Sequence, residues 1–198
     1  MKLKVWICSG LFLVLATASA TALVAQDKKS LKDDPMMAKW MEMSTPGAQH
    51  KILEPLVGKW TYTCKTNMPG MPAEETTGTC ETKWTMDGRF IQDDVKGTMM
   101  GQPFHGMGFT GYDNVKKKFV NTWIDNGNTG IMTGEGTYDA ATKTFTYTGE
   151  CPDMMTGKYT KSRSTIKNTD TGWTMQAFKT GTDGKETMMM EIQATRTK

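Results

Sequence analysis

Residues 103–125 read PFHGMGFTGYDNVKKKFVNTWID, two runs of strand length on either side of the turn signal Asp113-Asn114. Each run is rich in aromatic and β-branched residues, as half-buried antiparallel strands require. Residues 138–145 repeat the turn in the shared pattern Tyr-Asp-x-x-x-Lys-x-Phe. The Asp can hydrogen-bond to its own backbone two residues on, and the Tyr and Phe can face each other across the strands. The repeat therefore predicts two hairpins with the same turn.

The alternation of strands and turns extends over most of the chain. Past Trp60, nine turn signals separate ten runs, which we predict to be strands over 59–67, 76–86, 89–98, 103–112, 118–125, 130–138, 144–150, 158–168, 173–180 and 186–196. A meander of this length usually closes into a barrel, because closure removes the exposed strand edges. We therefore predict an all-β fold, a ten-stranded antiparallel up-and-down barrel.

A short helical pattern precedes the first strand. Its apolar residues recur at helical spacing: Ile52, Leu53, Leu56 and Val57. Pro46 suits a first helical turn, and Pro55 together with Gly58 ends the pattern. We expect this segment to cap one mouth of the barrel and to bury its apolar stripe there.

The N-terminus divides into two further segments. Residues 1–25 have the charged, apolar and small-residue order of a secretory signal peptide, with cleavage after Ala20 or Ala25. Residues 26–44 form a polar, Met-rich leader, which we expect to be mobile with one helical turn around 36–43. The barrel domain then covers 45–198. We expect a secreted, periplasmic protein without stable membrane insertion after cleavage.

The charge balance indicates which partners are unsuited to this chain. Removal of Lys2 and Lys4 with the signal lowers the net charge from +3 to +1. A surface so nearly neutral has no general attraction for nucleic acid or anionic membranes. We therefore expect no nucleic-acid partner, while a protein partner stays undetermined by the sequence.

Three cysteines follow the predicted signal peptide. The expected strand pairing of the first hairpin indicates a disulfide between two of them. If residues whose numbers sum to about 144 face each other, Trp60 meets Trp84 and Cys64 meets Cys80. Directly opposed positions are close to disulfide distance, and an oxidising compartment would allow the bond. We predict a Cys64–Cys80 disulfide, with Cys151 left as a thiol at a strand end.

Gly58-Lys59-Trp60, a Gly-x-Trp motif after the short helix, resembles the lipocalin and calycin signature. That resemblance implies that a basic residue near the end of the last strand packs over the Trp, and Arg196 is the matching residue. A guanidinium on an indole face contributes about 0.5–2 kcal/mol and would close the barrel.

Longer stretches resemble a bacterial secreted family known as "domain of unknown function 1579". The resemblance covers about residues 45–196 and includes Trp84-x-x-x-Gly88-Arg89-Phe90, Met99-Met100-Gly101-Gln102-Pro103-Phe104 and Gly111-Tyr112-Asp113-Asn114. It implies a calycin-like barrel and no assigned activity, and it supplies no catalytic residues.

No catalytic or cofactor pattern stands out in the sequence. There is no Ser–His–Asp order, metal-ligand motif or phosphate loop, so we predict no catalytic residues, no metal site and no cofactor. The 18 Met residues leave soft-metal (copper) binding as an alternative. His105 is the candidate for a haem ligand, but its neighbours Phe104 and Gly106 have the parity expected of the packed face.

Binding of a small apolar ligand in the barrel lumen is the function we expect, and a non-enzymatic interaction module is the other alternative. A ten-stranded barrel is wide enough to hold one small molecule. The candidate lining residues share the parity of the aromatic positions, with Asp125 as a polar anchor: Tyr62, Trp84, Met86, Trp123, Asp125, Met132, Tyr147 and Trp173.

Overall fold

The computed structural model describes residues 34–197 apart from 69, 155 and 182. The predicted signal peptide and the start of the predicted leader lie outside these residues. The described chain forms two compact units, which divide between Thr45 and Pro46. The second unit contains all ten strands.

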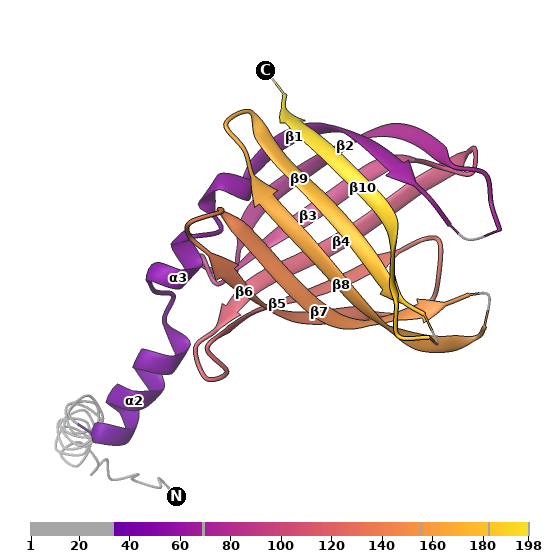
Figure 1. Ribbon diagram of the computed structural model, residues 1–198. Coiled ribbons are helices and arrows are strands. Elements are labelled where there is room, and N and C mark those ends of the chain that lie inside the picture. The colour runs from indigo at the N-terminus through magenta and orange to yellow at the C-terminus, as the bar shows by residue number, and fades with distance from the viewer. Residues whose placement is uncertain (1–33, 69, 155, 182, 198) are drawn as a thin grey trace, which may run out of the picture. The chain divides into compact units, whose positions relative to one another are not determined.

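The strands form one closed antiparallel barrel in which each strand pairs with its neighbours in sequence and β1 pairs with β10 (Figure 1). This confirms the predicted ten-stranded up-and-down architecture. The strands are β1 (Gly58–Thr66), β2 (Glu74–Thr85), β3 (Phe90–Met99), β4 (Gln102–Asp113), β5 (Lys118–Asp125), β6 (Met132–Asp139), β7 (Thr144–Asp153), β8 (Lys158–Asn168), β9 (Gly172–Thr180) and β10 (Glu186–Arg196).

The repeated turn forms as its sequence predicts. Tyr112 pairs with Phe119 and Tyr138 pairs with Phe145, so both Tyr–Phe pairs face each other across their hairpins. In the first turn, Asp113 Oδ1 accepts hydrogen bonds from the backbone nitrogens of residues 115 and 116. The shared Lys of the pattern adopts the left-handed conformation in both turns, with φ of 56° at Lys117 and 53° at Lys143.

The segment before β1 closes one end of the barrel. The predicted single helix is two short elements, α3 (Ala48–Lys51) and the 3-10 helix η1 (Glu54–Leu56). Leu53 and Leu56 are buried among Ile91, Phe119 and Phe145, which point inward from the strands. Ile52 and Val57 pack against the same cluster, so all four residues of the predicted apolar stripe take part in the core of this end. We call this the closed end and the opposite one the far end.

Unit 1 contains helix α2 (Pro35–Ser44), which is longer than the single turn predicted for the leader. Asp34 caps its N-terminus by accepting a hydrogen bond from Met36 N at 2.8 Å, and Pro35 occupies the first turn. None of its residues is buried, and Trp40 is 62% exposed. The helix therefore forms from local capping rather than from the burial of an apolar face.

The register of the first hairpin differs from the prediction. Trp60 pairs with Cys80, and Cys64 pairs with Thr76, so facing residues sum to 140 rather than 144. Cys80 thus lies four residues along β2 from the partner of Cys64, which is about 13 Å at the rise of a strand. That offset exceeds the Cα separation that a disulfide tolerates, and both thiols are free. The predicted Cys64–Cys80 bond is wrong.

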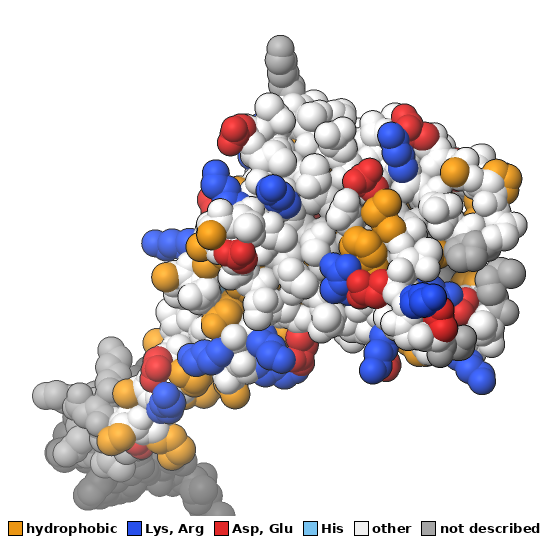
Figure 2. Space-filling model, in the orientation of Figure 1, with side chains coloured by type: hydrophobic (Ala, Val, Ile, Leu, Met, Phe, Trp, Pro, Cys, Tyr) orange, Lys and Arg blue, Asp and Glu red, His pale blue; other side chains and the backbone are white. Residues whose placement is uncertain are grey.

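The outer face of the barrel carries charges of both signs. In Figure 2, Lys and Arg side chains lie next to Asp and Glu side chains over the visible face rather than in patches of one sign. Ion pairs on the outer face include Lys59 with Glu81 and Lys118 with Glu135. Within the part of the chain that the structure describes, no helix is long and apolar enough to cross a membrane.

Candidate ligand site in the barrel lumen

The closed end is sealed around Trp60, which is 2% exposed. The Arg196 guanidinium lies 4.3 Å from the centre of its ring, and Arg196 Nη1 donates to the Val57 carbonyl at 3.2 Å. Trp60 Nε1 donates to the Leu56 carbonyl at 2.9 Å. Gly58 has a φ of +144°, and a Cβ there would collide with the guanidinium of Arg196. The predicted Trp60–Arg196 closure is therefore confirmed, and it explains the Gly-x-Trp motif.

Several predicted lining residues belong to this apolar closure. Trp173 packs edge-to-face on Trp60, with ring centres 6.3 Å apart. Trp84 donates from Nε1 to Glu54 Oε2 at 2.7 Å and packs against the cluster under η1. Tyr147, 2% exposed, lies in that same cluster. These three side chains pack into the core of the closed end rather than around an open space.

Three inward-facing rings, Tyr147 among them, lie against the wall, because the neighbouring strand has glycine beneath them. The pairs are Tyr62 on Gly78, Trp123 on Gly106 and Tyr147 on Gly136. At Gly106 an added Cβ would lie 2.7 Å from Trp123 Cη2, far inside contact distance. Glycines inside strands often mark bends or bulges, but here they make room for aromatic rings. A ring that lies along the wall does not project into the middle of the barrel.

Solvent reaches the inner face on the β8–β9 side. Every residue of β9 is half-buried, including the inward-facing Met175 and Ala177. On β8 the inward-facing Ser162 and Ser164 are half-buried as well. In a barrel whose interior is filled, inward-facing side chains are buried as Phe145 is at the closed end, where it is 0% exposed. The inward-facing side chains of β8 and β9 are therefore less completely buried than those at the closed end.

One row of paired residues crosses five strands on the inner face. Thr82 pairs with Asp93, Asp93 with Gly108, Gly108 with Trp123, and Trp123 with Met132. Because Gly108 has no side chain, the Asp93 carboxylate and the Trp123 indole meet over it. A Cβ at Gly108 would lie 3.3 Å from Asp93 Oδ2 and 3.1 Å from Trp123 Cε3. Trp123 and Met132 were predicted to line the lumen, whereas Asp93 was not.

Asp93 is a carboxylate in an apolar wall. Its Oδ1 accepts a hydrogen bond from Thr82 Oγ1 at 2.6 Å. Burial raises the pKa of Asp93 to about 6, and the Thr82 hydrogen bond opposes that shift. The residue has the parity of Ile91 and Val95 on β3, and an acidic residue between two inward apolar positions is the sequence signal that would have identified it.

A second polar group lies nearby without a partner. The Tyr147 hydroxyl is buried and makes no hydrogen bond. Burial raises the pKa of Tyr147, and the negative charge of Asp93 raises it further. The phenol therefore lies within electrostatic range of Asp93. Unsatisfied buried hydroxyls are uncommon in folded proteins and need an explanation.

The far half of the lumen holds further polar side chains. The predicted Asp125 accepts from Trp123 Nε1 at 2.7 Å and from the Gly127 nitrogen at 2.9 Å, so it fixes the indole and the turn after β5. Lys179 forms an ion pair with Asp153 at 2.6 Å, and the side chains are 25% and 10% exposed. Sequence reasoning missed this pair, since only the β7–β8–β9 pairing brings its members together.

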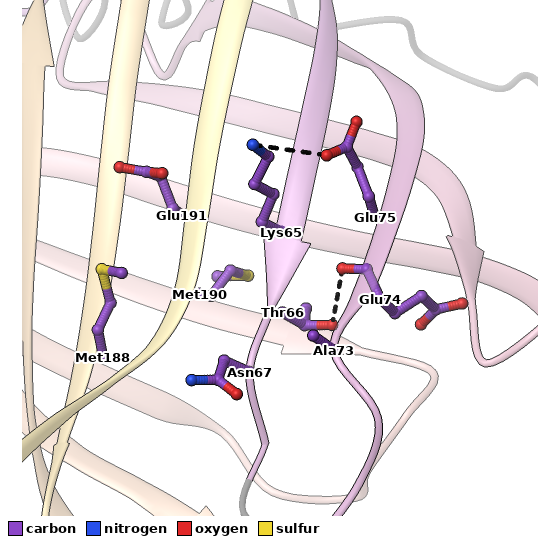
Figure 3. A pocket seen from close by; sticks show the side chains of 9 residues that line it. All are labelled: Lys65, Thr66, Asn67, Ala73, Glu74, Glu75, Met188, Met190 and Glu191. Atoms are coloured by element: carbon purple, nitrogen blue, oxygen red, sulfur yellow. Dashed lines mark hydrogen bonds and ion pairs between the residues drawn. The ribbon is translucent and has the colours of Figure 1, made fainter.

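A surface pocket of about 310 Å³ lies at the rim, where β1, β2 and β10 meet at the far end (Figure 3). Two of its side chains, Lys65 and Glu75, form an ion pair at 3.5 Å on the outer face. The residues that line it are Lys65, Thr66, Asn67, Ala73, Glu74, Glu75, Met188, Met190 and Glu191. A second hollow of about 460 Å³ lies over β5, β6 and β7.

Two candidate residues of the sequence lie away from the lumen. Met86 was predicted to line it, but it falls in the turn after β2 with a φ of 47° and is 66% exposed. The prediction is wrong because β2 ends at Thr85, so strand parity stops before residue 86. His105 points outward, lies 3.4 Å from Asp94 and is half-exposed, as the parity of its neighbours indicated.

The described thiols and carboxylates were compared with the arrangements that a metal centre or a thiol nucleophile needs. Among residues 34–197, gaps excepted, no group of three His, Cys, Asp or Glu side chains could hold a metal ion. Burial raises the pKa of Cys64 to about 11 and that of Cys80 to about 12, so both thiols stay protonated at neutral pH. A thiol in that state is a poor nucleophile.

Comparisons with known proteins agree with this geometry. The crystal structure of Rv2717c from M. tuberculosis resembles this barrel with a TM-score of 0.57 and 11% sequence identity, over 78% of this chain and 100% of that one. That likeness concerns the fold alone. No curated protein matches the sequence. A family profile described as "Protein of unknown function (DUF1579)" matches residues 45–196, and the chain therefore belongs to that family.

Proposed function

We propose that the protein binds a small, mostly apolar molecule in the far half of its lumen. The observation that carries the proposal is the half-burial of inward-facing residues on β8 and β9, against the full burial of Phe145 and Leu53 at the closed end. A barrel sealed at one end and accessible inside has the form of a binding cup.

The chemistry of the wall supports an apolar ligand. Met132, Met175 and Ile192 share the inner face with the flat ring of Trp123. Aromatic and thioether surfaces with few polar groups are typical of pockets for small apolar molecules. The glycines under the rings add to the space, because they let large side chains lie along the wall.

Fluorescence of the neutral dye Nile red tests the proposal. We expect purified protein to raise the emission of the dye and shift it to the blue with saturable binding. The substitution Ala177→Phe places a ring on the inner face of β9 and should weaken binding at least tenfold. Thr174→Phe adds the same ring on the outer face of β9 and is the matched control, because Thr174 pairs with the outward-facing Lys167 and Gln193.

The two variants separate lumen binding from surface adsorption. Equal loss of dye binding in both variants, or no saturable binding to the unmodified protein, would overturn the proposal. Circular dichroism of each variant shows whether the barrel has folded. Lumen binding requires loss in Ala177→Phe and retention in Thr174→Phe.

We also propose that the protein is exported with residues 1–25 removed. The order of charged, apolar and small residues in that segment supports export. Intact-mass measurement of protein recovered from the host should give a chain that begins at Thr21 or Gln26. A mature chain that retains Met1 or Lys2 would contradict export by this route.

A further inference from the structure

The inner face of the barrel carries carboxylates without cationic partners. Asp93 accepts from the Thr82 hydroxyl, and within the described ranges no Lys, Arg or His pairs with it. Asp125 accepts from the neutral groups of Trp123, Gly127 and Asn128. A half-buried carboxylate in an apolar wall that lacks a counter-charge is costly, and such groups concentrate at functional sites.

Two cations on the inner face of the described residues are already engaged. Lys179 pairs with Asp153 at 2.6 Å, on the β7–β9 side of the barrel. Arg196 lies over Trp60 at the closed end and donates to the Val57 carbonyl. The carboxylates of Asp93 and Asp125 on the β3–β5 wall therefore lack a partner cation, and they would attract a cation that enters the lumen.

The indole beside Asp93 adds a second element of recognition. The Trp123 indole lies over Gly106 and Gly108 and is half-buried, and its Nε1 donates to Asp125 Oδ2. The Asp93 carboxylate meets the same ring over Gly108. A carboxylate next to an exposed aromatic face binds an ammonium group by charge and by cation–π attraction together.

We propose that the lumen selects apolar amines, with the ligand's ammonium group at Asp93 against the Trp123 indole and its apolar part along Met132 and the β8–β9 wall. This inference rests on the proposed lumen binding and names the ligand class. Asp93 is accessible to a ligand because its surface is half-buried rather than enclosed.

Three probes with the same eight-carbon chain test the charge preference. Octylamine is a cation at pH 7.5, 1-octanol is neutral and octanoate is an anion. Each competes with Nile red for the unmodified protein under identical salt conditions. We expect octylamine to displace the dye at a concentration at least tenfold lower than 1-octanol, and octanoate to be the weakest of the three.

The substitution Asp93→Asn tests the anchor. It keeps the shape of the side chain and the acceptor for Thr82, and it removes the charge. We expect octylamine to lose at least tenfold in affinity while 1-octanol changes less than threefold. Asp94→Asn is the matched control on the outer face, where Asp94 contacts Lys96 and His105, and it should leave all three affinities unchanged.

The outcomes distinguish the two proposals. Saturable Nile red binding with equal displacement by all three probes, or a preference for octanoate, would overturn the amine proposal and leave lumen binding intact. Absence of Nile red binding overturns lumen binding itself. If Asp93→Asn fails to bind the dye because it does not fold, the probe series on the unmodified protein still decides the charge preference.

Discussion

At the scale of single residues, the positions of glycines determine how the side chains of the inner wall are arranged. Gly106 and Gly108 let the Trp123 indole lie flat, and Gly108 brings that ring to Asp93. The Asp93 carboxylate beside this ring is poorly solvated and accepts one hydrogen bond, from the Thr82 hydroxyl. A small change on β4 therefore alters both the shape and the charge of the lumen.

Asp93 should make the stability of the barrel depend on pH. Its pKa is about 6 in the folded protein, against about 3.9 in an unfolded chain, so the folded state holds the proton more tightly. The contribution of the protonated Asp93 to the stability of the folded state is full below a pH of about 4, and it is lost as the pH rises through about 6. Asp93→Asn cannot titrate, and we expect its free energy of unfolding relative to the unmodified protein to rise by about 2 kcal/mol between pH 4 and 7.

Urea unfolding at a series of pH values measures this difference. The groups around Asp93 are Thr82, Cys80 and Tyr147, and both Cys80 and Tyr147 have a pKa raised by burial, so neither titrates in this window. Asp94→Asn serves as the outer-face control. A constant difference between Asp93→Asn and the unmodified protein across pH 4–7 would show that the carboxyl is not buried as described.

Gly106 should tolerate no side chain. A Cβ there would overlap the Trp123 ring, so Gly106→Ala must displace the indole or the strand, and we expect a loss of about 2–3 kcal/mol of stability. Gly47→Ala is the control, because nothing lies within 4 Å of the position and its φ is −123°. Urea unfolding measures the loss, and intrinsic fluorescence reports the displaced Trp. Equal stability of the two variants would contradict the close packing.

At the scale of elements, two hairpins use the same left-handed turn residue. The Asp of each repeat fixes the start of the turn, and the Lys four residues later, Lys117 or Lys143, takes a positive φ before the second strand begins. A side chain in that conformation is strained by about 1 kcal/mol, which glycine avoids. The turn is therefore specified by its Asp and by strand pairing rather than by the preference of the Lys.

Replacement of the turn Lys by glycine should stabilise the protein. We expect Lys143→Gly to raise the free energy of unfolding by about 0.5–1 kcal/mol, since relief of strain outweighs the added freedom of the unfolded chain. Ala141→Gly, in the same turn but without a positive φ, should lower it by a similar amount. Thermal unfolding of both variants measures the effect. A lower midpoint for Lys143→Gly would contradict the left-handed assignment.

At the scale of the whole molecule, closure depends on the pairing of the first and last strands. β1 and β10 pair over seven residue positions, and the Trp60–Arg196 contact lies at the end of that seam. Without β10, both β1 and β9 present unpaired edges, which are templates for association with other chains. The closed end itself is held by a segment that precedes β1, so the two termini of the barrel unit cooperate at one mouth.

Loss of the last strand should abolish the closed barrel. A chain that ends at Gly184 is expected to unfold without a cooperative transition and to form oligomers, as measured by urea unfolding and analytical ultracentrifugation. A chain that lacks residues 1–44 is the control and should keep the stability of the full chain within about 1 kcal/mol, because no residue of α2 is buried. A monomeric, cooperatively folded chain without β10 would show that closure is dispensable.

Much of the fold could be predicted because local signals specify it. Turn residues set the number and order of the strands, alternation with a period of two set which residues face inward, and Gly58, Trp60 and Arg196 indicated the closure. The first hairpin shows the limit of such signals. A register sum of 140 instead of 144 keeps every side chain on the same face, so alternation cannot distinguish the two.

The register, the free thiols and the contents of the lumen were decided only by the tertiary structure. Register is set jointly by all ten strands as they close, and it separated Cys64 from Cys80. Closure also determined that Trp84 and Trp173 fill one end while solvent reaches the β8–β9 wall. Asp93 lies beside the Trp123 ring because the residue paired with it on the next strand is a glycine, and no single segment of sequence contains that relation between strands.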